Sequence, residues 1–250
     1  MRGMNFIIQI YEIQDPREAE VLVQLGVDHI GSVILSEDDW KREEIKEVVS
    51  ICREGKKKSS MIFLFQDMDT IKRTIEYYMP DIVHFCEYIT NSIIERHIER
   101  QIELKSYFPF IQIMRSIPVP EKGRRMPLTI EEIKRFEPYT DIFLIDTYVK
   151  DEPVKGYIGI TGRTCDWDIA RNIVKELKRP VILGGGLNPE NVYEAIRKVE
   201  PDGVDSCTGT NATDKEGIPI RFKKDINKVK KFIEGCRRYE REREKSKGST

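Results

Sequence analysis

The chain has 250 residues, with 42 Lys and Arg against 43 Asp and Glu, and 39% of its residues are hydrophobic. This length fits one large domain or two small ones, and the hydrophobic fraction supplies a core, which excludes a disordered chain. The net charge of −1 excludes a strongly basic nucleic-acid binder, and no apolar run approaches the roughly 20 residues that span a bilayer.

Short apolar runs alternate with longer amphipathic stretches along the whole sequence. The runs predict eight strands, at 6–10, 29–34, 61–65, 81–85, 110–114, 142–145, 181–183 and 204–206. The stretches predict helices at 16–25, 40–53, 68–78, 92–105, 130–136, 167–177, 190–199 and 226–236. Eight strand–helix units in a chain of this length are typical of a closed barrel of parallel strands. We therefore predict a single (β/α)8 TIM barrel over 1–236, followed by a charged tail at 237–250, a helical extension that frays into disorder.

The N-terminus and the cysteines indicate a cytoplasmic protein. Met1 leads into the first strand without an apolar signal core, and Met4 is an alternative start. The five cysteines are odd in number and form no C-x-x-C pair, which argues against a disulfide framework or a structural zinc site. They are Cys52, Cys86, Cys165, Cys207 and Cys236.

Three of the predicted loops that follow strands carry glycines. These loops are 159–162 after the sixth strand, 184–186 after the seventh and 207–211 after the eighth. In a barrel of this kind the active site lies at these strand ends, and backbone N–H groups of glycine loops form anion sites. The glycines alternatively serve only tight turns, but three such loops in succession favour a phosphate site.

The glycine loops resemble those of a known family. Residues 159–167 (GITGRTCDW) resemble the G-G-T-G-x-x-F-D-W segment of phosphoribosylanthranilate isomerases, enzymes of tryptophan biosynthesis. Residues 184–192 (GGGLNPENV) are similar to that family's A-G-G-L-x-P-x-N-V, and 203–209 (GVDSCTG) to its G-V-D-x-S-S-G. The resemblance implies a barrel of the ribulose-phosphate-binding type. It also implies a sugar-phosphate site formed by Gly162, Gly185, Gly186, Thr208 and Gly209.

The reaction of that family is an Amadori rearrangement, in which an aldose derivative becomes a ketose. A general acid protonates the ribose ring oxygen, and a general base then removes a proton from the neighbouring carbon. The family's acid is an Asp at the end of the sixth strand, which Asp146 matches here. A carboxyl among apolar neighbours has its pKa raised, as an acid requires. The alternative interpretation of Asp146 is a solvent-facing cap of the strand.

The family's general base is not matched. It is a Cys in a K-I-C-G segment at the end of the first strand, where residues 9–12 read Gln-Ile-Tyr-Glu. Tyr11 takes the place of the Cys, but a phenol with a pKa of about 10 is almost fully protonated at neutral pH. Glu12 is ionised at that pH but stands one position later. The base therefore stays open between Tyr11 and Glu12, and Tyr11 alternatively only covers the barrel mouth.

Further departures concern the loops that would face the substrate. The family has S-x-R after the second strand, and its Arg faces the anthranilate carboxylate, whereas residues 36–39 here read Ser-Glu-Asp-Asp. This acidic cluster favours a neutral or cationic aglycone unless Lys41 or Arg42 compensates, or else it is a solvated helix start. The family's Q-L-H-G at the fourth strand becomes residues 84–87, His-Phe-Cys-Glu. Arg115, at the predicted end of the fifth strand, is a candidate contact for substrate oxygens, or else a rim salt bridge.

The sequence thus predicts a phosphoribosylanthranilate isomerase-like enzyme, an aldose–ketose isomerase acting by acid–base catalysis on phosphoribosylanthranilate or another phosphorylated sugar. The alternative is a regulatory barrel that binds a phosphorylated metabolite and has lost the activity. We expect a phosphorylated sugar as its ligand and no metal, organic cofactor, nucleic acid or membrane as a partner. A homodimer remains an open option.

Overall fold

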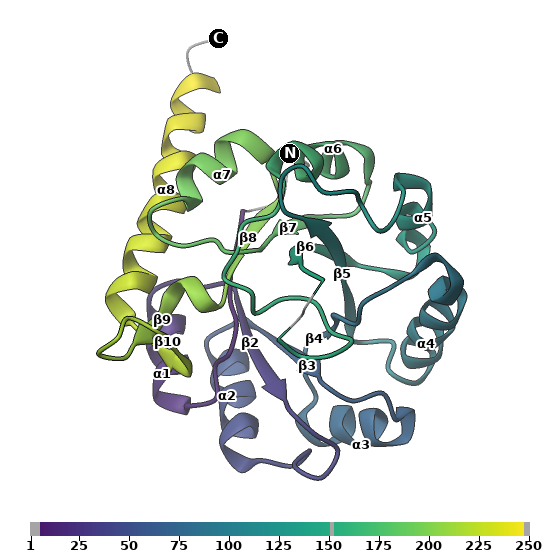
Figure 1. The fold of residues 1–250 in the computed structure, drawn as a ribbon. Helices are drawn as coiled ribbons and strands as arrows, with labels where there is room; N and C mark the ends of the chain where they lie inside the picture. The colour runs from purple at the N-terminus through teal and green to yellow at the C-terminus, as the bar shows by residue number, and fades with distance from the viewer. Residues whose placement is uncertain (1–5, 151–152, 248–250) are drawn as a thin grey trace.

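The computed structural model describes residues 6–150 and 153–247, and its centre is a closed barrel of eight parallel strands (Figure 1). The strands are β1 (Ile7–Ile10), β2 (His29–Ile34), β3 (Lys58–Phe63), β4 (Ile82–Phe85), β5 (Gln112–Pro120), β6 (Ile142–Tyr148), β7 (Val181–Leu183) and β8 (Gly203–Ser206). The barrel closes because β1 pairs with β8 from Ile7 opposite Gly203 to Ile10 opposite Ser206. The predicted TIM barrel is confirmed.

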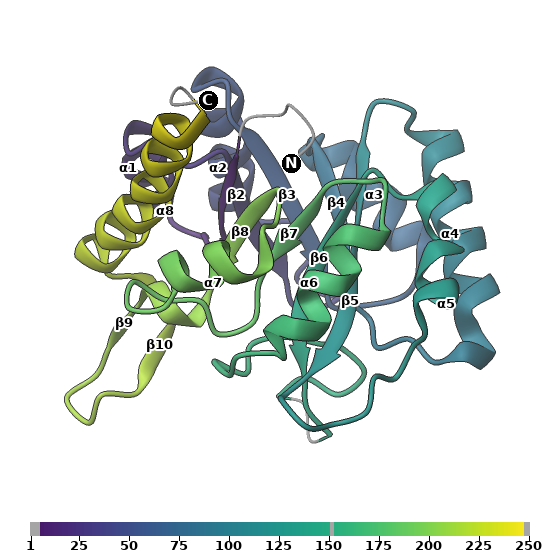
Figure 2. The same ribbon diagram turned by 90° about the horizontal axis from the view of Figure 1, so that it is seen from above.

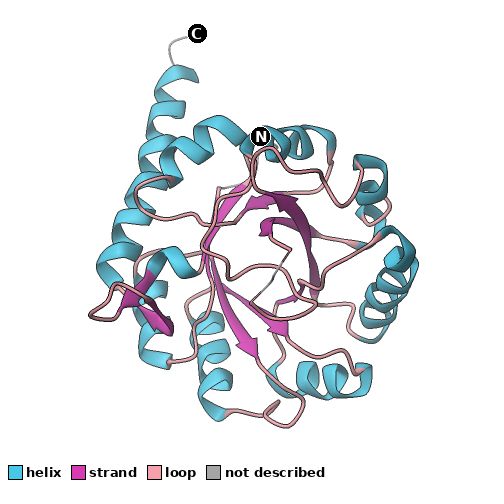
Figure 3. Cartoon of the chain, viewed as in Figure 1, coloured by secondary structure: helices cyan, strands magenta, loops and turns pink. Residues whose placement is uncertain are grey.

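Helices surround the barrel as an outer ring (Figure 3). They are α1 (Pro16–Gln24), α2 (Glu43–Glu54), α3 (Met68–Tyr78), α4 (Ile94–Tyr107), α5 (Ile130–Lys134), α6 (Trp167–Glu176), α7 (Val192–Val199) and α8 (Ile226–Lys247), with 3-10 turns η1 (Asn91–Ile93), η2 (Glu137–Tyr139) and η3 (Thr208–Thr210). Several begin at a capping side chain; Thr129 and Glu132 form the capping box that starts α5. Within the described ranges, no helix has the length and apolarity that a bilayer crossing requires.

The strands are buried on both faces, as parallel strands of a barrel are. One set of side chains fills the barrel interior, and it comprises Ile82, Met114, Ile142, Leu144 and Ile182. The alternate set packs against the helices; Ile113, next to Met114, belongs to the core that includes Leu104 of α4. This alternation decides which side chains can reach a ligand at the barrel mouth.

Strand β5 is longer than predicted, which moves Arg115 from the strand end to its middle. The sequence pattern ends the strand at Met114, but β5 continues to Pro120. Beyond Arg115 it pairs only with β6, so Pro118 and Pro120 stand where the other edge of the strand is free. Proline is tolerated at such an edge because its missing N–H is not needed there.

One feature near the C-terminus differs from the prediction. An antiparallel hairpin of β9 (Asn211–Thr213) and β10 (Pro219–Lys224) follows β8 and projects away from the barrel (Figure 2). Helix α8 continues to Lys247, which agrees with the helical extension expected after 236; the end of the expected tail, 248–250, lies outside the described residues. The extension carries ion pairs at helical spacing, Arg237 with Glu240 and Arg238 with Glu242.

The loop after β6 crosses the mouth of the barrel (Figures 1 and 3). We call residues 154–160 the mouth loop. Its main chain is fixed to the end of β4, since the Tyr88 amide donates to the Gly156 carbonyl (2.9 Å) and the Ile158 amide to the Cys86 carbonyl (2.9 Å). The barrel mouth is therefore roofed by backbone and by the side chains of this loop.

Candidate active site

Two adjoining pockets lie at the carboxyl ends of the strands. The glycine pocket is lined by the three glycine loops, with Thr161, Gly162, Gly185, Gly186, Leu187, Thr208 and Gly209. The barrel pocket lies beneath the mouth loop and is lined among others by Tyr11, Val33, Leu64, His84, Cys86 and Tyr157. Four residues line both pockets: Asp146, Ile160, Asp205 and Cys207. The structure thus brings together all five residues of the predicted phosphate site.

The glycine pocket requires glycine at two successive positions. Gly185 and Gly186 have φ of +76° and +61°, a conformation that side chains disfavour. A Cβ at Gly185 would lie 2.3 Å from Thr147 Oγ1, and one at Gly186 would lie 2.5 Å from the carbonyl carbon of Arg163. The Thr147 hydroxyl donates to the Arg163 carbonyl at 2.6 Å, which holds these loops against each other.

Main-chain amides of the glycine pocket are available to a ligand. Among the described residues, the amides of Gly162, Gly185 and Gly186 find no hydrogen-bond acceptor. Other amides of the same loop are occupied, because Gly184 donates to the Ile145 carbonyl (2.7 Å) and Asn188 to Asn191 Oδ1 (2.9 Å). Free N–H groups on successive left-handed residues form an anion-binding concavity. The pocket has the chemistry of a phosphate site.

Two carboxyl groups stand where the two pockets meet. Burial raises the pKa of Asp146, on β6, to about 6, although the Thr147 amide donates to Asp146 Oδ1 at 2.7 Å. Burial raises the pKa of Asp205, on β8, to about 7, and the charge of Asp146 contributes to that rise. Gly159 leaves room for the first group, since a Cβ there would lie 2.5 Å from Asp146 Oδ2. Both groups can therefore exchange protons near neutral pH.

Asp205 was not among the residues predicted for the site. It is fixed by Gln9, whose Nε2 donates to Asp205 Oδ1 at 3.0 Å. His29 Nδ1 lies 3.1 Å from Gln9 Oε1, and burial lowers the pKa of His29 to about 3, so this partner is neutral. A carboxyl within an otherwise buried strand is the sequence signal that would have identified Asp205.

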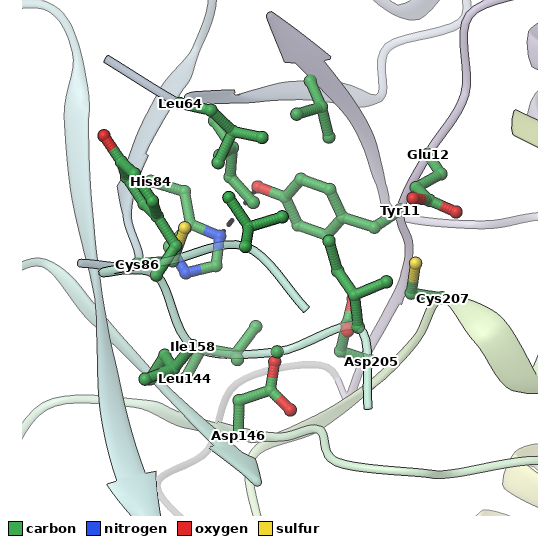
Figure 4. Close-up of a pocket in the computed structure, with 16 residues that line it drawn as sticks. Tyr11, Glu12, Leu64, His84, Cys86, Leu144, Asp146, Ile158, Asp205 and Cys207 are labelled. Atoms are coloured by element: carbon green, nitrogen blue, oxygen red, sulfur yellow. Dashed lines mark hydrogen bonds between the residues drawn. The ribbon is translucent and has the colours of Figure 1, made fainter. Parts of the chain in front are cut away.

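Tyr11 lies inside the barrel pocket with its hydroxyl already bonded. The hydroxyl lies 2.6 Å from Ser60 Oγ and 2.9 Å from His84 Nδ1, and Figure 4 shows it directed at the His84 ring. Burial raises the pKa of Tyr11 well above 10 and lowers that of His84 to about 3. A protonated phenol beside a neutral imidazole is a poor proton acceptor. The ring itself lies against Gly31, where a Cβ would be 2.4 Å from Tyr11 Cδ1.

Glu12 lies at the rim of the barrel pocket and pairs with the hairpin. Its Oε1 accepts from Arg221 Nε at 2.7 Å, and its Oε2 accepts from Asn211 Nδ2 at 3.1 Å. Burial by itself would raise the pKa of Glu12, but the charge of Arg221 and the Asn211 hydrogen bond hold it below its ordinary value. The carboxylate is ionised yet compensated, and in Figure 4 it lies on the far side of the Tyr11 ring from Asp146. Glu12 thus anchors the hairpin to β1.

Arg115 lies outside both pockets, which corrects the expectation of a substrate contact. Because it is in the middle of β5, its side chain is directed to the helix layer and is only 1% exposed. Its Nε donates to Gln101 Oε1 (2.8 Å) and its Nη1 to Glu87 Oε2 (2.8 Å). Arg100 donates to the other oxygen of Glu87 at 3.1 Å. The alternative interpretation, a salt bridge at the rim, is correct in the ion pair but wrong in its location, since this ion pair is buried.

The buried cluster of Glu87, Arg100 and Arg115 is expected to matter for stability. Glu87→Gln leaves two arginines without their counter-charge and should lower the free energy of unfolding by about 3–5 kcal/mol. Glu121→Gln is the matched control, because Glu121 pairs with Arg163 at the surface and its loss should cost about 0–1 kcal/mol. Urea unfolding of both variants measures the difference. Equal losses would contradict a structural role for the cluster.

The acidic cluster after β2 does not line either pocket. Residues 36–39 are exposed. Lys41, which could have compensated them at the substrate, instead lies 4.9 Å from the centre of the Tyr77 ring, and Arg42 lies 4.0 Å from Asp39. Two of the altered residues 84–87 do reach the site, since His84 in β4 and Cys86 directly after it both line the barrel pocket.

Comparisons with known proteins agree with this geometry. Residues 9–235 match the family model described as N-(5'-phosphoribosyl)anthranilate (PRA) isomerase. A protein of that name from Methanosarcina acetivorans is 29% identical over 237 residues, which covers 92% of each chain. Another, from Caldanaerobacter subterraneus subsp. tengcongensis, is 30% identical over 217 residues, covering 86% of this chain and 89% of the relative.

Solved structures share the fold. The phosphoribosyl anthranilate isomerase from Thermotoga maritima is 22% identical and superimposes with a TM-score of 0.65, covering 93% of this chain and 98% of that one. At this identity the superposition shows the barrel and not the chemistry. The family model, in contrast, matches the chain from β1 to α8 and includes both pockets. The chain belongs to the N-(5'-phosphoribosyl)anthranilate isomerase family.

Proposed function

We propose that the protein isomerises an N-(5'-phosphoribosyl) amine to the corresponding 1-amino-1-deoxyribulose 5-phosphate. One observation carries this proposal: two carboxyls with raised pKa values stand between a pocket of free main-chain amides and a pocket roofed by the mouth loop. The first pocket fits the phosphate and the second fits the group attached to the sugar. The names of the curated relatives support the same reaction.

The residues where the two pockets meet carry out different steps of the proposed reaction. The phosphate accepts hydrogen bonds from the amides of Gly162, Gly185 and Gly186, which places the ribose between the two carboxyls. Protonated Asp146 gives its proton to the ring oxygen, the bond from that oxygen to the first ring carbon breaks, and an iminium ion forms. Ionised Asp205 removes the proton from the second carbon, and the resulting enol becomes the ketone. Asp205 thereby takes the place of the family's Cys.

A barrel that only binds a metabolite explains the site less well. Two carboxyls whose pKa values are raised by burial destabilise the folded protein at neutral pH. A binding protein gains nothing from that cost, because the free amides already hold the phosphate. An acid–base pair, in contrast, requires groups that titrate near the working pH.

The pH dependence of turnover tests this acid–base pair. The reactive form carries a single proton on the pair, held by Asp146, with Asp205 ionised. We expect kcat/KM to fall below pH 6, where both carboxyls are protonated, and to fall above pH 7, where both are ionised. Measured between pH 4.5 and 9 with an N-(5'-phosphoribosyl) amine, the profile should be bell-shaped with its maximum between the two values. A rate that rises steadily to pH 9 would show that a group of higher pKa acts as the base.

Removal of the Tyr11 hydroxyl tests whether Tyr11 or Asp205 is the general base. Tyr11→Phe should change kcat less than tenfold, since the phenol stays protonated throughout the working range. The variant should unfold about 1–3 kcal/mol more easily, because Ser60 and His84 lose a buried partner. A fall in kcat of about 10²–10⁴ would instead identify Tyr11 as the base.

A cytoplasmic homodimer is the setting we propose for this activity. All five cysteines are free in the structure, which suits a reducing compartment. The isomerase from Thermotoga maritima is described as dimeric, which supports a dimer here.

A further inference from the structure

We infer that the substrate of this protein carries an uncharged, largely hydrocarbon group on its sugar nitrogen, in place of an aryl carboxylate. This inference rests on the proposed function and names the class of amine on which it acts. It depends on what lines the barrel pocket, on where the neighbouring cations are bound and on how the mouth loop closes the pocket.

The walls of the barrel pocket are aliphatic and lack cations. No Lys or Arg is among its described lining residues. Its apolar lining comes from Val33, Ile62, Leu64, Leu144, Val154, Ile158 and Ile160. The ionisable oxygens that face it belong to carboxyls, Glu12, Asp146 and Asp205, and to two tyrosines. Figure 4 shows Leu64 at the opposite end of the pocket from Asp146.

The one imidazole in the pocket cannot serve as a counter-charge. Both nitrogens of His84 have partners, Nδ1 at 2.9 Å from the Tyr11 hydroxyl and Nε2 at 2.7 Å from Ser116 Oγ. Burial and the charge of Arg115 lower the pKa of His84 to about 3, so the ring is neutral at any pH where the protein works. A substrate carboxylate finds neither a charge nor a free donor on this side chain.

Three cations that lie behind or beside residues of the barrel pocket are already bound to other groups. Arg221 pairs with Glu12, and Arg115 pairs with Glu87 behind β5. Lys224 donates to the Cys207 carbonyl at 2.9 Å and to Asn211 Oδ1. Moving any of these cations to the substrate would leave a buried oxygen without its partner. The free energy lost there offsets the free energy gained by pairing with a substrate carboxylate.

The mouth loop makes a charged group still less favourable. Tyr157 and Ile158 of this loop are buried over the pocket, and the main chain there is bonded to β4, so water has little access. A carboxylate in such a place would lose its hydration without gaining a partner and would be repelled by Asp205. A cationic amine is also disfavoured at the Leu64 end, because the carboxyls stand at the sugar end. An uncharged ring or alkyl group suits the walls.

Two substrates that differ by one carboxylate test the inference. We expect kcat/KM for N-(5'-phosphoribosyl)aniline to exceed that for N-(5'-phosphoribosyl)anthranilate at least tenfold with the full chain at pH 7. Equal values, or a preference for the anthranilate compound, would overturn the inference and leave the proposed isomerisation intact. Val33→Arg, which puts a cation on the pocket wall, should reverse the preference at least tenfold. Val33→Met is the control of similar length and should leave it unchanged.

Binding distinguishes a wrong aglycone from a wrong reaction. Reduced 1-(o-carboxyphenylamino)-1-deoxyribulose 5-phosphate, a ligand of another isomerase of this family, and its phenylamino counterpart can be titrated calorimetrically into the unmodified protein. We expect the phenylamino compound to bind at least tenfold more tightly. Tighter binding of the phenylamino compound without turnover of either substrate would contradict the proposed function but support the inference of an uncharged aglycone. Equal or inverted affinities would sink the uncharged aglycone, whether or not turnover is observed.

Discussion

Asp146→Asn is expected to lower kcat by about 10²–10⁴-fold while changing the Kd of ribose 5-phosphate less than twofold. The Asn side chain cannot give a proton to the ring oxygen, whereas the proposed phosphate contacts are the main-chain amides of Gly162, Gly185 and Gly186. Steady-state kinetics and calorimetric titration of the same preparation give both numbers. A preserved kcat would eliminate Asp146 as the acid, and a large loss of phosphate affinity would mean that the variant has damaged the pocket.

The same substitution has a second readout that depends on pH. The pKa of Asp146 is raised from 3.8 to about 6, so the folded protein holds a proton that the unfolded chain releases in this window. The ionised carboxyl therefore destabilises the fold above pH 6, by about 3 kcal/mol, and not below pH 3.8. Asp146→Asn should be more stable than the unmodified protein at pH 8 and equally stable at pH 3.5. Asp168→Asn, at the exposed start of α6, is the control in both assays.

Gly186→Ala is expected to weaken ribose 5-phosphate binding by about 10–100-fold, which corresponds to about 1.4–2.8 kcal/mol. The residue has φ of +61°, and a methyl group there would meet the main chain of Arg163 at 2.5 Å. Since main chain cannot step aside as a flexible side chain does, the loop must shift and its amide must turn away from the phosphate. Calorimetric titration at pH 7 measures the loss.

Gly123→Ala is the control that separates backbone strain from the contact. Gly123 has φ of +82°, but a Cβ there has no heavy atom within 4 Å. This variant should lose about 1 kcal/mol of stability and none of its phosphate affinity. If Gly186→Ala binds ribose 5-phosphate as tightly as Gly123→Ala does, the glycine pocket does not hold the phosphate.

The sequence was sufficient for the barrel because each unit repeats the same local pattern, an apolar run followed by an amphipathic helix. The sequence pattern was not sufficient where a strand pairs with a neighbouring strand on one side only. Pro118 and Pro120 argue against a strand, yet β5 continues through them because only β6 pairs with it there. The hairpin after β8 was also missed, because its strand Pro219–Lys224 is short and mostly exposed, although Ile220 and Phe222 alternate with polar residues there.

For the site as well, features set by local sequence were predicted, and features set by distant partners were not. The residues predicted to bind phosphate come from glycine loops whose backbone requirement is local, and the structure gathers them in one pocket. The roles of Tyr11, Glu12 and Arg115 depend on partners far along the chain, namely Ser60, Arg221 and Glu87. Asp205 is marked in the sequence as a carboxyl within a buried strand, but its nearness to Asp146 arises only when the barrel closes.

A crystal structure with the reduced phenylamino product analogue is the most direct test of how the two pockets work together. We predict that the phosphate oxygens accept hydrogen bonds from the amides of Gly162, Gly185 and Gly186. The first two sugar carbons should lie between Asp146 and Asp205, and the ring should lie beneath the mouth loop. A phosphate bound away from those amides, or a sugar that neither carboxyl contacts, would contradict the isomerase mechanism proposed for this barrel.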